Sequence, residues 1–261
     1  GSKLKEVTRT GIEMMLAVDV SNSMLAQDFE PSRLERTKFA IDRLTQQLEQ
    51  DRIGLIVFAG DAYMQLPITS DYVAARSFAA QISPTMVSKQ GTAIGAAIDL
   101  AANSFSSGSE GSRVIVVISD GENHEDDALA AAKAAAEKGI RIYTIGIGTP
   151  EGAPISIDGE FIKDEQGDMV VSKLDEQLLE QIALTTGGAY IRATNRSLGL
   201  DEIVQKINEV EKKELTSTVF EDFNEQYQYL IGLALALLLL EFAMLERRSR
   251  LLARFNIFRK R

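Results

Sequence analysis

Four short apolar segments, each followed by a polar or glycine-containing turn, constrain the fold of this chain more than any other feature. They cover residues 12–18, 53–59, 113–119 and 140–147. Apolar runs of this length are typical of strands buried on both faces, as strands in parallel sheets are. Helical segments are expected between them, over 31–50, 71–82, 92–105 and 125–138. This alternation predicts an α/β fold with a doubly wound, mostly parallel sheet and helices on both faces.

After the fourth predicted strand, the regular alternation of strands and helices is interrupted. Asp158-Gly159 and Gln166-Gly167 are turn pairs, so we expect a β-hairpin insertion near 155–171. A helix over 173–186, a short strand near 187–192 and an amphipathic helix over 200–213 follow. The predicted elements therefore run from residue 12 to residue 213.

Polar side chains with metal-ligand chemistry follow two of the predicted strands. Asp19, Ser21 and Ser23 form a D-x-S-x-S motif after the first strand, and Asp120 follows the third. Thr92 comes after Gly91 at the start of a predicted helix. Open α/β sheets bind ligands at the carboxyl ends of their strands. Hydroxyl, carboxylate and water oxygens suit Mg²⁺ or Mn²⁺, so these five residues predict a site for one of those cations.

The three separated pieces resemble the metal-ion-dependent adhesion site of von Willebrand factor type A domains, over roughly residues 10–213. The resemblance implies that Ser21 and Ser23, and Thr92 in the ligand-binding state, offer direct oxygen ligands. It implies that Asp19 and Asp120 act largely through water. A metal held mainly by neutral hydroxyls keeps positive charge and binds a carboxylate from a protein partner.

Other interpretations of the same residues are open at this stage. D-x-S-x-S is also a plain N-cap turn. Asp19 could be a phosphotransfer nucleophile, but haloacid-dehalogenase-type enzymes need an acid where Ser21 stands. The pattern of receiver domains is incomplete as well. A metal-dependent hydrolase or phosphatase is the alternative function, although no residue of the motif is set aside as a general base. A structural anchor that binds no metal is a third possibility.

A strongly apolar segment near the end of the chain predicts a membrane anchor. Residues 229–245 contain one charge, Glu241, and seven Lys or Arg without any acid follow in 247–261. Seventeen helical residues span about 25 Å, the short end of a membrane crossing. The positive-inside rule places the basic tail, 246–261, in the cytoplasm. A connector over 214–228 would join it to the domain; a buried core helix is the alternative for 229–245.

Composition excludes several classes of function. The chain has no Cys and a single His, which rules out disulfide scaffolds, zinc–thiolate centres, cysteine nucleophiles and multi-histidine metal sites. A net charge of −10 argues against a nucleic-acid-binding surface, because phosphates need a basic face. We therefore expect no nucleic-acid partner.

Two longer segments indicate a particular group within the type A domain family. They are FAGDAYMQLPITSDY, 58–72, and SKLDEQLLEQIALTTGGAY, 172–190. Both resemble the bacterial Bat (aerotolerance) proteins, membrane-bound type A domain proteins often encoded beside MoxR-type AAA+ ATPases. The resemblance implies a non-enzymatic scaffold or chaperone-like role in envelope complexes. It also implies an inner-membrane location, a periplasmic domain, and other Bat proteins and such an ATPase as partners.

Overall fold

The computed structural model describes residues 11–48, 50–106, 112–123, 125–157, 159–209 and 227–246. Residues 6–212 form one compact unit, and residues 1–5 with 213–261 form another. The first unit contains the predicted domain and is described first.

A six-stranded sheet forms the centre of the domain, in the spatial order β10-β5-β4-β1-β2-β3. Every neighbouring pair is parallel except β2 and β3, which are antiparallel. The strands are β1 (Glu13–Asp19), β2 (Arg52–Phe58), β3 (Ala62–Thr69), β4 (Arg113–Ser119), β5 (Arg141–Gly146) and β10 (Tyr190–Arg192). The predicted α/β class and mostly parallel sheet are confirmed.

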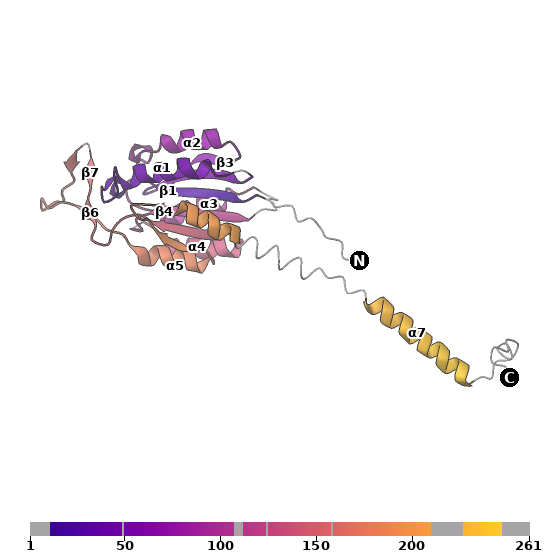
Figure 1. Ribbon diagram of the computed structural model, residues 1–261. Coiled ribbons are helices and arrows are strands. Elements are labelled where there is room, and N and C mark those ends of the chain that lie inside the picture. Colours follow the sequence, from indigo (N-terminus) through magenta and orange to yellow (C-terminus); the bar gives the residue numbers. More distant parts are fainter. Residues whose placement is uncertain are drawn as a thin grey trace. The chain divides into compact units, whose positions relative to one another are not determined.

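Helices cover both faces of this sheet (Figure 1). One face carries α1 (Arg33–Thr45), α2 (Tyr72–Ala80) and helical residues 200–209; the other carries α3 (Ile94–Ala102), α4 (Ala128–Glu137) and α5 (Glu176–Thr185). Strand alternation divides the core accordingly. In β1, Met14, Leu16 and Val18 face the first layer, whereas Met15 and Ala17 face the second. Both faces are apolar, which explains why β1 is a continuous hydrophobic run.

The strand β3 was not predicted from the sequence. It lies at the sheet edge, most of its residues are partly exposed, and it contains Pro67. Proline is tolerated at an edge because its missing N–H is not needed by a further strand. Because β3 is partly exposed and contains a proline, its sequence lacks the continuous apolar run by which the other strands were predicted.

The predicted hairpin insertion is a ribbon over residues 153–172, built from two short antiparallel pairs instead of one. β6 (Ala153–Pro154) pairs with β9 (Val171–Ser172), and β7 (Ser156–Ile157) pairs with β8 (Glu160–Phe161). An isolated bridge joins Lys163 to Met169. The ribbon projects from the end of the domain where the parallel strands finish (Figure 1).

In the other unit, the chain is helical over α7 (Tyr227–Glu246). From Ile231 to Leu240 its large apolar side chains are more than half exposed. Within the described part of the chain, no helix meets the combined length and apolarity of a membrane span. The structure therefore does not show the membrane helix expected over 229–245. The rest of the expected connector and basic tail, 214–226 and 247–261, lies outside the described residues.

Candidate metal centre

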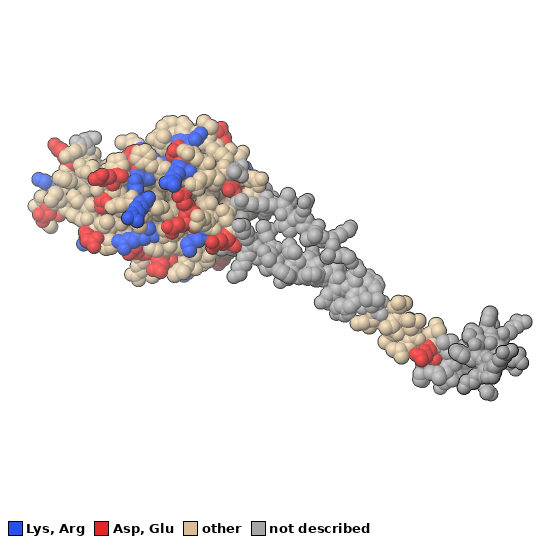
Figure 2. Space-filling view, in the orientation of Figure 1, with Lys and Arg blue, Asp and Glu red and all other residues tan. Residues whose placement is uncertain are grey.

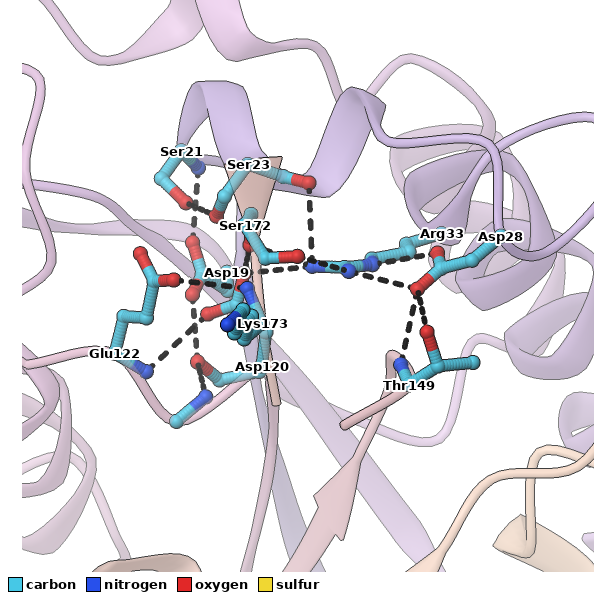
Figure 3. Close-up of polar contacts among 12 residues, drawn as sticks. Asp19, Ser21, Ser23, Asp28, Arg33, Asp120, Glu122, Thr149, Ser172 and Lys173 are labelled. Atoms are coloured by element: carbon cyan, nitrogen blue, oxygen red, sulfur yellow. Dashed lines mark hydrogen bonds and ion pairs between the residues drawn. The ribbon is translucent and has the colours of Figure 1, made fainter. Parts of the chain in front are cut away.

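The loop after β1 brings two hydroxyls together beside a buried carboxylate. Asp19 is the last residue of β1 and is fully buried. Its Oδ1 accepts a hydrogen bond from the backbone N–H of Ser21 at 2.8 Å. The chain then enters the short 3₁₀ helix η1 (Asn22–Leu25), which places the Ser23 hydroxyl 2.9 Å from the Ser21 hydroxyl. Sequence spacing and local turn geometry are enough to build this half of the site (Figure 3).

The second carboxylate reaches the same place from β4. Ser119 ends that strand, and its hydroxyl donates to Asp19 Oδ2 at 2.6 Å. Asp120 follows and is fully buried. Gly121 then turns the chain with φ +83°, where a side chain would meet the backbone oxygen of Asp175 at 2.2 Å. The glycine is thus required for the tight turn that leaves Asp120 against the end of β1.

A buried arginine, which sequence reasoning missed, holds Asp120 in place. Arg33 Nη1 donates to Asp120 Oδ2 at 2.9 Å and to the Ser172 hydroxyl at 2.8 Å. The Ser172 hydroxyl donates in turn to the same Asp120 oxygen at 3.0 Å. At its other edge, Arg33 binds Asp28 through two hydrogen bonds of 2.8 Å, a bidentate pair. Figure 3 shows Arg33 lying between the two carboxylates.

One local signal could have pointed to Arg33. It is the first residue of α1, where the partial positive charge of the helix N-terminus disfavours a cation. A fully buried arginine at that position needs carboxylate partners, and Asp28 lies only five residues earlier. Asp120 is 87 residues away, and nothing in the local sequence identifies it as the second partner.

Thr92 lies in the loop that connects the other two pieces. The Ala93 N–H donates to the Ala59 carbonyl at 2.7 Å, just beyond the end of β2. The Gln90 side chain accepts from the Asn22 N–H at 3.2 Å, which joins the loop to η1. The Ile94 N–H donates to Asn123 Oδ1 at 3.1 Å, which joins it to the loop after Asp120. Thr92 itself is buried. These contacts bring its loop to the strand end and loops that carry Asp19, Ser21, Ser23 and Asp120.

The two carboxylates differ in their electrostatic surroundings. Burial and the nearby Asp120 charge, opposed by hydrogen bonds from Ser119 and Ser21, together raise the pKa of Asp19 to about 7. Asp28 is also partly buried, but its contacts with Arg33 and Thr149 hold its pKa below the usual range. Asp19 is therefore the carboxylate whose ionised form lacks a compensating positive charge.

This donor set fits a hard divalent cation. The guanidinium of Arg33 pairs with Asp28 and Asp120, whereas Asp19 is held by neutral donors from Ser21 and Ser119. A bound Mg²⁺ or Mn²⁺ would supply the missing positive charge, with the Ser21, Ser23 and Thr92 hydroxyls as neutral oxygen donors. Among the described residues no three His, Cys, Asp or Glu side chains gather as metal ligands, so such a site would depend on hydroxyls.

Comparisons with known proteins agree with this architecture. The von Willebrand factor type A domain family matches residues 13–207. An aerotolerance-related membrane protein from Bacteroides fragilis is 51% identical, with a TM-score of 0.73, over 76% of this chain and 100% of that one. BatB from Bacteroides thetaiotaomicron is 50% identical, with a TM-score of 0.74, over 77% and 100%.

More distant relatives extend the comparison. A UPF0353 protein of Mycolicibacterium paratuberculosis is 29% identical over 90% of this chain and 70% of its own length. A mussel byssus protein, proximal thread matrix protein 1, was solved with a zinc-occupied adhesion motif; it is 15% identical with a TM-score of 0.57 and shares the fold alone. The matched range and the two Bacteroides structures show that this chain belongs to the von Willebrand factor type A domain family, in its bacterial Bat (aerotolerance) group.

Proposed function

We propose that this protein is a membrane-anchored binding module that uses Mg²⁺ or Mn²⁺ to engage a carboxylate on a protein ligand. Its metal residues are Asp19, Ser21, Ser23, Thr92 and Asp120. The role is that of a scaffold or chaperone-like component in envelope complexes.

One observation carries this proposal. The Ser21 and Ser23 hydroxyls lie together at a strand end beside two carboxylates, and those carboxylates are already committed to protein hydrogen bonds. Such carboxylates can shape a cation's surroundings but are poorly placed to abstract protons, which favours binding over hydrolysis. A cation with neutral hydroxyl ligands keeps charge for an external carboxylate.

The membrane part of the proposal is supported separately. The exposed apolar side chains of α7 are unfavourable in water and suit a lipid environment. The similar Bacteroides fragilis protein is itself a membrane protein. We propose that α7 anchors the chain in the bacterial inner membrane, with the domain periplasmic and the basic tail cytoplasmic. By resemblance, other Bat proteins and a MoxR-type ATPase are the proposed partners.

Calorimetric titration of the domain with Mn²⁺ and with Mg²⁺ tests the metal assignment. Asp19→Ala should weaken binding by about 10–100-fold, the usual effect of losing a carboxylate that organises a metal's surroundings. Asp99→Ala, which removes an exposed carboxylate from α3, is the matched control and should bind like the unmodified domain. Equal affinity in all three proteins would refute the metal site.

A further inference from the structure

The ribbon has apolar side chains on two faces, one buried or partly buried and the other exposed. On the inner side, Ile155 and Ser172 are buried and Ile162 and Val170 are partly buried. The outer side carries three large apolar side chains, Phe161, Met169 and Val171, which are 52%, 54% and 46% exposed.

Strand register explains why these three share a face. Lys163 pairs with Met169, and the Val170 N–H donates to the Ile162 carbonyl, so Lys163 and Met169 point to the same side; Phe161 and Val171 themselves pair with Ser156 and Pro154. Alternate residues of a strand point to the same side, so Phe161, Met169 and Val171 form one outer apolar strip. Burial accounts for the apolar residues of the inner face, but the outer strip has no partner within the described part of the domain.

The ribbon is fastened directly to the candidate metal centre. Its last residue, Ser172, is the residue that bridges Arg33 and Asp120. The next N–H, of Lys173, donates to Glu122 Oε1 at 3.1 Å, two residues after Asp120. β7 also contacts η1, the segment that carries Ser23. The ribbon therefore contacts the loops of the metal residues through Ser172 and through β7; Figure 3 shows the contacts of Ser172.

We propose that the outer apolar strip and the metal centre form one continuous binding surface for a single protein ligand, and that Arg33 and Ser172 fix the position of the strip. The inference rests on the proposed function and specifies its partner. The ligand presents an Asp or Glu side chain to the metal and an apolar segment to Phe161, Met169 and Val171.

Charge on the ribbon adds a further requirement for this ligand. Glu160, Asp164, Glu165 and Asp168 are exposed around the strip, with Lys163 as a basic neighbour. Figure 2 shows acidic side chains at the end of the domain where the ribbon projects. The ligand surface should therefore carry Lys or Arg next to its apolar segment, because complementary charges favour the correct partner and repel others.

Site-specific photocrosslinking in the full-length chain, in membranes of its own host, tests this surface. A benzophenone amino acid is placed at Phe161 on the strip, at Ser88 in the loop before Thr92, or at Leu184 on α5. Ser88 is exposed and Leu184 is 66% exposed, so Leu184 serves as a control away from the proposed surface. Each variant is irradiated with Mg²⁺ or with a chelator, and with or without Asp19→Ala.

The proposal expects one and the same adduct, identified by mass spectrometry, from Phe161 and from Ser88. Both adducts should require Mg²⁺ and Asp19, and Leu184 should give none of it. Ser172→Ala should reduce the Phe161 adduct about fivefold, the effect of one lost hydrogen bond.

Two results would contradict the proposal in different ways. A metal-dependent adduct at Ser88 without one at Phe161, or a different or metal-independent adduct at Phe161, overturns the shared surface and leaves the proposed function standing. The absence of any metal-dependent adduct at Ser88 counts against the proposed function itself, and with it against this inference.

Discussion

At the scale of single residues, Arg33 and Asp19 divide the electrostatics of the site between them. Arg33 donates two hydrogen bonds to Asp28 and one to Asp120, but within the described contacts Asp19 receives only neutral donors, from Ser21 and Ser119. A buried carboxylate without a counter-charge is costly, and this cost is what raises its pKa. The cation that we propose would remove the cost, so binding and the protonation of Asp19 should compete.

This competition gives a pH dependence. The pKa of Asp19, about 7 in the folded metal-free domain, exceeds its ordinary value of 3.8. Between these values the folded domain retains a proton that the unfolded chain has lost, so the free energy of unfolding should fall as pH rises through this range. Asp19→Asn should remove that fall and make the metal-free domain more stable at pH 8, by about 1–3 kcal/mol. Urea unfolding at pH 4.5, 6 and 8 in chelator measures both effects.

Added Mn²⁺ provides the second half of this test. Apparent affinity should rise about tenfold per pH unit up to about pH 7 and then level off, because the metal displaces one proton. If the free energy of unfolding of the metal-free domain is the same at all three pH values, Asp19 is ionised throughout and its assigned role is wrong.

At the scale of elements, the ribbon separates into a base that the site needs and a tip that it does not. Ser172 at the base takes part in the Arg33 network. The tip turn, 164–168, is exposed. Within it, the Asp164 side chain accepts hydrogen bonds from the backbone N–H groups of Gln166 and Asp168. Removing that turn would leave few buried groups without partners.

We therefore expect the ribbon to tolerate shortening at its tip. Replacing residues 164–168 by Asn-Gly joins the paired residues Lys163 and Met169 through a two-residue turn that suits antiparallel strands. The free energy of unfolding should change by no more than about 0.5 kcal/mol, as for other surface changes. Thermal unfolding and Mn²⁺ titration check this expectation; loss of cooperative unfolding would show that the tip is part of the folded core.

At the scale of the whole molecule, the chain joins an acidic domain to an apolar helix and a basic end. The proposed arrangement puts the metal centre outside the cytoplasm, where it can meet envelope proteins, and the basic residues inside. The orientation rests on the seven Lys and Arg residues after position 246.

Cysteine labelling tests this orientation cleanly, since the chain contains no Cys of its own. Val73→Cys introduces a single thiol on α2 at a position that is 68% exposed. In spheroplasts of cells with the full-length protein, a membrane-impermeant maleimide should label it without lysis. A cytoplasmic protein with an introduced surface thiol is the control. Labelling only after the inner membrane is broken would place the domain in the cytoplasm and remove the envelope role.

The sequence by itself determined the elements that are coded locally. β1, β2, β4 and β5 are continuous apolar runs, and burial on both faces makes such runs readable one strand at a time. Asp19, Ser21, Ser23, Thr92 and Asp120 could be selected because each follows a strand or precedes a helix, and parallel strands bring their carboxyl ends to one edge. Their role as metal ligands remains a prediction.

Only the tertiary structure decided which distant groups complete that edge. Ser172 is 52 residues from Asp120, Arg33 is 87 residues from it, and no periodic pattern in the sequence records a contact between single polar side chains. The edge strand β3 was missed for a related reason, because half-exposed residues and a proline leave little hydrophobic pattern. Buried strands and helices leave a repeating pattern of apolar residues in the sequence, so they can be predicted from it. A buried ion pair depends on where the packed helices and sheet place two distant side chains.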